Sequence, residues 1–126
     1  MTTLREAIPG KKLKVFLVEE DKSHHEPLYM TILRLLHDMG VVGATVFRGT
    51  EGFGERRAIH TDKLEVMSFS LPITIEATDT PQKIDEAATL IAELLTSGLV
   101  EVSHTFIMHQ GLGEASDSPL QGGDTC

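Results

Sequence analysis

The sequence predicts an α+β domain in which a four-stranded antiparallel sheet carries two helices on one face. Three observations support this prediction. Short runs rich in branched and aromatic residues alternate with two longer runs whose apolar residues recur every three or four positions. Glycine, proline and threonine stand at the boundaries of these runs, where turns and helix ends favour them. The order along the chain is therefore strand, helix, strand, strand, helix, strand.

The first half of this order occupies residues 12–49. In 12–20, KLKVFLVEE, apolar side chains fall on both faces of the expected strand, so both faces should be covered. In 26–39 the apolar residues follow helical spacing, and Gly40 stands where a helix would end. The run 41–49, VVGATVFRG, is rich in β-branched residues and predicts the second strand.

The second half has the clearest alternation of the chain, in residues 67–76. Pro72 lies inside this run, and since proline has no N–H for a strand ladder, we expect a bulge or a sheet edge there. The run 80–98 begins with a capping threonine and a proline, and Gly98 is expected to end this second helix. Residues 99–108 then predict the fourth strand.

Two right-handed crossovers can place both helices on one face of the sheet, which gives the split βαβ, or ferredoxin-like, arrangement βαββαβ. We expect one domain over residues 12–109, with a flexible segment at 1–11 and a disordered tail at 110–126 that is rich in Gly, Ser and Asp. Apolar residues on the second face of the sheet predict that further subunits cover it.

Composition argues against several classes of function. A net charge of -8 opposes a surface that coats nucleic acid, because such surfaces need many lysines and arginines. No apolar run approaches the roughly 20 residues that span a bilayer, so direct membrane insertion is not expected. The one cysteine, Cys126, allows no internal disulfide and only a link between chains, which is typical of a cytoplasmic protein.

A long connection at 50–63 joins two neighbouring strands. Glycines in its first half permit backbone conformations closed to other residues and let main-chain N–H groups approach an anion. The basic residues from position 48 to 63 are Arg48, Arg56, Arg57 and Lys63, and the acidic ones are Glu51, Glu55 and Asp62. This small positive excess favours an anionic ligand. A hairpin tip whose glycines only turn the chain would explain the same pattern.

Several segments resemble a known family: EEDK through EPLY, then GVVGATVFRGTEGFGERRAIH, then LPITIE. The most specific part is RGxxGFG with a histidine six residues after its last glycine. Over about residues 12–108 the chain resembles the PII-like signalling proteins, in the branch long catalogued as a domain of unknown function. The resemblance implies a ferredoxin-like homotrimer that binds adenine nucleotides in clefts between subunits.

The resemblance also implies which residues form the site. The matching positions are Glu19, Asp21, Lys22, Arg48, Gly49, Gly52, Phe53, Gly54 and His60. We expect Arg48 and the backbone of residues 52–54 to bind the phosphates, while Phe53 covers the ligand or a neighbouring subunit. His60 is expected to steady the loop or to contact phosphate. The residues expected to contact a partner protein from the loop are Arg56, Arg57 and Lys63.

Departures from the better-known PII proteins restrict the range of ligands and modifications that the resemblance implies. Where those proteins have Gly-Asp-Gly-Lys after the second helix, this chain has SGLVEVSH, which favours AMP or ADP over ATP. Glu55 and Arg56 replace an Arg-Gln pair, so 2-oxoglutarate sensing is not predicted. The only tyrosine, Tyr29, falls on the first helix, so uridylylation of the loop is not predicted either. No obligatory cofactor is expected, and by resemblance the regulated partner is a membrane transporter or channel.

Two other classes of function were weighed. The copper-tolerance family has a similar trimeric ferredoxin-like architecture, so a metal-linked protein is the alternative. However, His24, His25, His104 and His109 have no zinc-like spacing and no cysteine joins them, so no metal site is predicted; His104 is expected at a subunit contact. An enzyme is not predicted, because the fold contains neither GxSxG nor a cysteine nucleophile.

Overall fold

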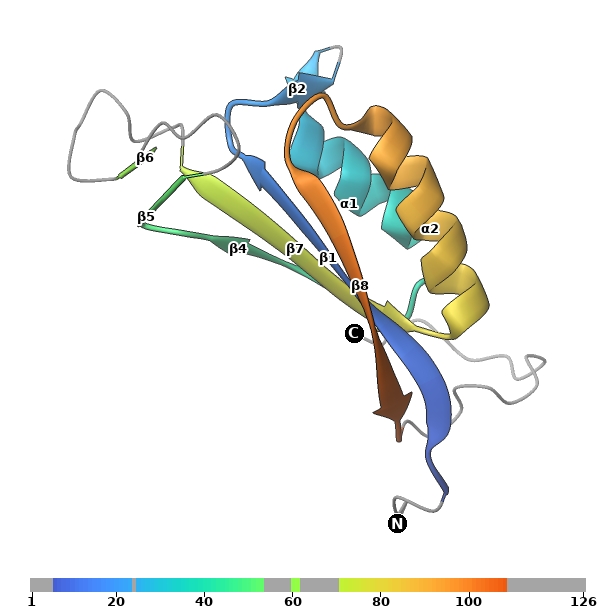
Figure 1. Cartoon of the computed structure of the whole chain (residues 1–126). Coiled ribbons are helices and arrows are strands. Elements are labelled where there is room, and N and C mark those ends of the chain that lie inside the picture. The colour runs from blue at the N-terminus through green and yellow to red at the C-terminus, as the bar shows by residue number, and fades with distance from the viewer. Residues whose placement is uncertain (1–5, 24, 54–59, 62–70, 109–126) are drawn as a thin grey trace.

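The computed structural model describes residues 6–23, 25–53, 60–61 and 71–108 (Figure 1). The main elements are β1 (Ile8–Val18), α1 (Leu28–Asp38), β4 (Ala44–Arg48), β7 (Pro72–Asp79), α2 (Pro81–Leu94) and β8 (Leu99–Ile107). Short paired strands add β2 (Lys22–Ser23), β3 (Glu26–Pro27), β5 (Glu51–Gly52) and β6 (His60–Thr61). The four longer strands form one antiparallel sheet in the order β4-β7-β1-β8, and both helices cover one of its faces. The predicted ferredoxin-like fold is confirmed.

The core lies between the sheet and the two helices. Alternate residues of the central strands β1 and β7 pair across the ladder and point to the helices, as Leu13 with Ala77 and Val15 with Ile75. The helical residues buried against them are Leu28, Ile32 and Leu36 from α1 and Ile84, Ala87 and Ile91 from α2. Each fully buried Leu or Ile side chain contributes about 1.5 to 3 kcal/mol by leaving water. This layer therefore holds the domain together.

The first strand begins at Ile8, before the expected start at residue 12. Its early residues pair with the end of β8, Ile8 opposite Ile107 and Gly10 opposite Thr105. A Cβ at Gly10 would meet the Ile107 side chain, so the glycine leaves room for Ile107 in its present position. Residues 8–11 therefore belong to the sheet and not to a flexible N-terminal segment.

Three other element boundaries differ from the sequence expectation. Helix α1 begins at Leu28 because Glu26–Pro27 pairs with Lys22–Ser23 in a small hairpin. Helix α2 ends at Leu94, before Gly98. Pro72 occupies neither an edge nor a bulge: it is the first residue of the central strand β7, where its carbonyl accepts a 2.8 Å hydrogen bond from the Gly49 N–H.

One buried carboxylate, that of Asp79, connects three parts of the fold. Its side chain is 1% exposed at the end of β7. Oδ2 accepts a hydrogen bond from the Val42 N–H at 2.8 Å, and Oδ1 accepts one from the Thr80 N–H at 2.7 Å. Thr80 occupies the N-cap of α2 without a side-chain cap bond, contrary to expectation. Asp79 therefore fixes the start of α2 relative to the connection between α1 and β4.

We predict that Asp79→Ala lowers the free energy of unfolding by about 2 to 4 kcal/mol, because two backbone N–H groups lose a charged acceptor. Urea denaturation at fixed protein concentration measures this loss. Asp85→Ala is the matched control, since Asp85 pairs with Lys11 at 2.8 Å on the exposed surface and should contribute less than about 1 kcal/mol. Equal losses for the two variants would contradict the role given to Asp79.

The face of the sheet opposite the helices carries an apolar row. The ladder places Phe47, Thr74, Phe16 and Leu99 side by side across all four strands on that face. Phe47 is 51% exposed and Leu99 is 55% exposed. This row agrees with the expectation that other subunits cover the face, which stays a prediction. No helix in the described part of the chain is long and apolar enough to cross a membrane.

Candidate functional site

Six of the predicted site residues gather at one end of the sheet, where β1 and β4 end and β7 begins (Figure 1). These residues are Glu19, Lys22, Arg48, Gly49, Gly52 and Phe53. The junction is held by the Glu19 N–H, which donates to the Leu71 carbonyl at 2.8 Å, and by the Gly49 bond to Pro72. The predicted site residues that lie outside the described part of the chain are Gly54, Arg56, Arg57 and Lys63.

Arg48 and Glu19 form an ion pair at this junction. Arg48 Nη2 donates to Glu19 Oε2 at 2.7 Å. The Arg48 side chain is 48% exposed, whereas the Glu19 side chain is only 21% exposed. The hydrogen bond that Arg48 donates to Glu19, and then the negative charge of Glu19, raise the pKa of Arg48, and Tyr29 in the first turn of α1 adds smaller contributions. The pair therefore holds a permanently charged guanidinium in place while half of its side chain faces solvent.

Only one oxygen of the Glu19 carboxylate is used by this pair. Oε1 is buried, and within the described residues it has no hydrogen-bond partner. A buried carboxylate oxygen without a donor costs free energy, and such an atom often marks a functional site. The sequence analysis had matched Glu19 to the family by position without finding this feature.

Close packing on Pro72, and not unusual backbone geometry, explains two of the loop glycines. A Cβ at Gly49 would lie 3.0 Å from Pro72 Cγ, and a Cβ at Gly52 would lie 3.1 Å from the same atom. Neither glycine has the positive φ that was expected; in the described chain Gly40 and Gly98 have it. The missing side chains thus let the segment after β4 lie against Pro72.

This segment continues into the short β5–β6 ladder. Gly52 pairs there with His60 through the backbone, so His60 is tied to the strand that follows Arg48. Phe53, next in the chain, is 59% exposed. A large exposed aromatic side chain at the end of β5 is suited to contact a flat ligand or another subunit.

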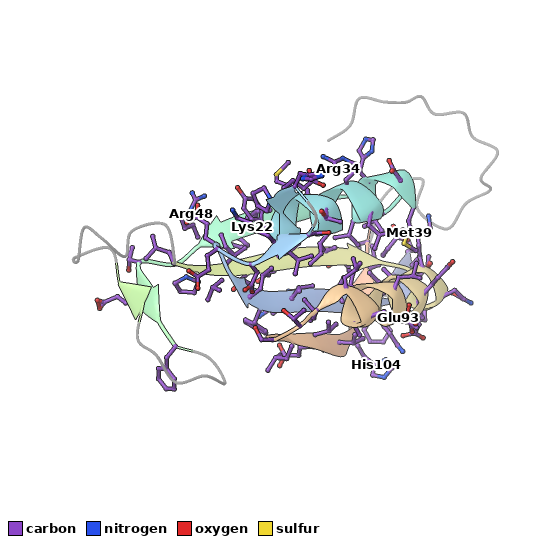
Figure 2. All side chains as sticks on the ribbon, turned by 90° about the horizontal axis from the view of Figure 1, so that it is seen from above. Lys22, Arg34, Met39, Arg48, Glu93 and His104 are labelled. Atoms are coloured by element: carbon purple, nitrogen blue, oxygen red, sulfur yellow. The ribbon has the colours of Figure 1, made fainter. Side chains whose placement is uncertain are left out.

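The β2–β3 hairpin carries Lys22 beside the same junction. Asp21 forms the turn before it: its Oδ2 accepts a 3.3 Å bond from the Val18 N–H, and its carbonyl accepts a 2.8 Å bond from the Leu28 N–H. Asp21 therefore shapes the turn. Figure 2 shows Lys22 and Arg48 at one end of the molecule, with Met39, Glu93 and His104 lying farther along it.

A clamp on Glu26 fixes this hairpin to α1. Arg34 donates from Nη1 to Glu26 Oε2 at 2.6 Å and from Nη2 to Oε1 at 3.0 Å. Thr31 Oγ1 also donates to Oε2, at 2.8 Å. The hydrogen bonds from Arg34 and then Thr31 lower the pKa of Glu26 from 4.5 to about 2. The sequence analysis missed this clamp, although Thr31 and Arg34 follow Glu26 by only five and eight residues at the start of α1.

The clamp predicts a pH dependence. Because the folded-state pKa of Glu26 is depressed, its contribution is complete above the ordinary value of 4.5 and is lost as pH falls toward about 2. A carbon-detected NMR titration of the Glu26 carboxyl should show this low pKa. Arg34→Gln should return the pKa most of the way to its ordinary value, and Thr31→Val should raise it less. A wild-type titration near 4.5 would contradict the clamp.

A hollow of about 370 Å³ lies at the same end of the sheet but at its opposite edge. Its lining residues are Ala92, Leu95, Thr96, Ser97, Gly98, Leu99 and Val100. Leu99 pairs with Phe16 near the end of β1, whereas Arg48 stands on the far edge strand β4. Gly98 turns the chain here with φ 92°, and a Cβ would collide with the Phe16 carbonyl oxygen. Sequence reasoning had placed the helix end and the fourth strand here and had noted the departure from Gly-Asp-Gly-Lys, but it did not predict a hollow.

The histidines do not gather into a metal site in the described residues, among which no group of three or more His, Cys, Asp or Glu side chains could hold an ion. His104 is exposed on β8, and His25 is exposed beside the hairpin. His24, His109 and Cys126 lie outside the described residues.

Comparison with protein families gives one extensive match. The model of the DUF190 family, described as Uncharacterized ACR, matches residues 10–106. A UPF0166 protein of Methanocaldococcus jannaschii is 33% identical over 97 residues, which cover 76% of this chain and 89% of that protein. A UPF0166 protein of Aquifex aeolicus is 35% identical over 77 residues, covering 61% and 73% of the two chains.

Solved structures with the same fold are PII-like proteins. CPII from Thiomonas intermedia K12, bound to ADP and bicarbonate, has a TM-score of 0.58 and 22% identity, with 82% of this chain and 93% of that chain covered. A PII-like signaling protein from Thermus thermophilus has a TM-score of 0.58 and 14% identity, with coverage of 81% and 92%. At this identity the likeness shows the fold.

Proposed function

The chain belongs to the DUF190 family, and we propose that it is a PII-like signal protein that binds an adenine nucleotide, with AMP or ADP favoured, at the Arg48 end of its sheet. The observation that carries the proposal is the half-exposed guanidinium of Arg48, which Glu19 holds beside the glycines that pack on Pro72. Preorganised guanidinium and backbone N–H groups are suited to phosphate. Lys22 adds a second cation on the neighbouring hairpin.

The remaining parts of a nucleotide fit the same region. Phe53 offers an aromatic face to a base or to a neighbouring subunit. His60 lies on the strand paired with Gly52 and would steady the loop around the ligand. The CPII protein of the same fold was solved with ADP and with AMP, which supports the choice of adenine nucleotides here.

We place the complete site between subunits of a homotrimer. Arg48 stands on the edge strand β4, and the hollow at Gly98 stands on the other edge strand β8, at the same end of the sheet. Subunits arranged head to tail in a ring would bring one edge beside the other. The exposed row with Phe47, Phe16 and Leu99 would then be covered inside the ring.

The proposed output is a binding event and not a chemical reaction. A phosphate held after β4 would order the loop at 50–63, and its residues Arg56, Arg57 and Lys63 would contact a partner in a ligand-dependent way. We propose a cytoplasmic protein whose partner is a membrane transporter or channel. The partner contact would then report the nucleotide state of the cell.

We predict that Arg48→Ala weakens AMP and ADP binding by roughly 1.5 to 3 kcal/mol, because a charge-assisted bond to phosphate is lost. Isothermal titration calorimetry measures the change. Lys83→Ala removes one positive charge at the other end of the molecule, where Lys83 bonds the Gly40 carbonyl at 3.1 Å, and should leave affinity unchanged. Unchanged affinity in Arg48→Ala would remove Arg48 from the site, and no binding by the wild type would overturn the proposed function.

We predict that the wild-type protein is a trimer whose assembly depends on the open face of the sheet. Native mass spectrometry should show three chains together with retained or added nucleotide. Phe47→Asp should release monomers, because the aspartate would place a charge in a covered apolar row. Phe106→Asp is the control, since Phe106 is 69% exposed and lies on the opposite face of the sheet, paired with Pro9. A wild-type monomer would contradict the intersubunit site.

A further inference from the structure

We propose that Glu19 tunes the selectivity of this site for ligand charge, lowering its affinity for ATP relative to its affinity for AMP. The inference rests on the proposed function, because it concerns the ligand that Arg48 would bind. It assigns Glu19 a role beyond holding the arginine: the carboxylate is a fixed negative charge beside the phosphate position.

The geometry brings any anion on Arg48 close to this carboxylate. Arg48 Nη2 donates to Glu19 Oε2 at 2.7 Å, and Tyr29 also interacts with Arg48. A guanidinium has five N–H donors, so donors remain for a ligand. A guanidinium is small and rigid, so an anion on its free side stands within a few ångströms of Glu19. The two negative groups would therefore share one cation.

Arg48 compensates the negative charge of Glu19 only in part. The second oxygen, Oε1, is buried and has no hydrogen-bond partner within the described residues. Arg48 therefore offsets the charge of Glu19 through one oxygen only, and the carboxylate still repels a second anion that binds to Arg48.

The neighbouring residues strengthen the same effect. Glu20 and Asp21 follow Glu19, and Lys22 alone balances these three carboxylates in the segment after β1. Glu20 is exposed, and Asp21 is fixed by its bond from the Val18 N–H. Phosphate sites usually concentrate positive charge, so a carboxylate bonded to Arg48 within an acidic segment requires a reason.

Charge selectivity supplies that reason. Repulsion from Glu19 increases with every negative charge on the ligand, so this carboxylate offsets part of the attraction that Arg48 exerts on each further phosphate. Glu19 would therefore lower the affinity for ATP more than that for ADP, and the affinity for ADP more than that for AMP. Such an order suits a module that must detect AMP while ATP is present.

The test compares AMP, ADP and ATP binding to the wild type and to Glu19→Gln by calorimetry, with EDTA to remove magnesium. Glutamine keeps an oxygen for Arg48 but removes the charge. At an effective dielectric near that of water, removal of the Glu19 charge should raise the affinity about threefold for each negative charge on the ligand. ATP carries about two more negative charges than AMP, so the ATP to AMP affinity ratio should rise roughly tenfold. Glu19→Ala removes the same charge and should shift the ratio in the same direction, which keeps the test decisive if Glu19→Gln folds poorly.

A matched variant serves as the control. Glu86→Gln makes the same charge change on an exposed part of α2 and should leave the ratio near the wild-type value. A ratio unchanged in Glu19→Gln, or equal weakening of all three nucleotides, would overturn the inference and leave the proposed function standing. Absence of nucleotide binding in the wild type would overturn both.

Discussion

The pairing of β1 with β7 at the centre of the sheet is the interaction on which the rest of the structure depends. It aligns Leu13, Val15 and Leu17 with Ala77, Ile75 and Ile73, and both helices pack on this apolar surface. The same pairing determines where the strands end. Because Leu17 lies opposite Ile73 and Ile73 lies opposite Arg48, residues distant in sequence emerge together at one end of the sheet.

That end of the sheet combines structural and functional constraints in a small space. Pro72 begins β7, accepts a bond from Gly49 and excludes larger side chains at Gly49 and Gly52. Glu19 continues β1 and meets Arg48, which ends β4. The hydrophobic core thus positions a half-exposed cation at the ends of two strands, which hold a side chain more precisely than a loop does. The arrangement accounts for a binding module more readily than for a catalyst.

The described chain presents its candidate site in two separated parts. Arg48 and the glycines lie on the β4 edge, while the hollow beside Gly98 lies on the β8 edge, and the width of the sheet separates them. Sequence reasoning predicted a cleft between subunits by resemblance, but it identified only the first part. The second part has no motif: its hydroxyl and apolar residues become a hollow only because α2 ends at Leu94 and Gly98 turns the chain.

The sequence by itself determined the order of elements, the residues of the core and the family, because periodicity and short motifs are local properties. Only the tertiary structure decided features that depend on contact across the fold. It extended β1 to Ile8 through pairing with β8, and it showed that Asp79 bonds the backbone N–H of the N-cap residue Thr80, whose own side chain makes no cap bond. It also showed that Glu19 pairs with Arg48. An ion pair between positions 29 residues apart depends on strand register and cannot be read from spacing along the chain.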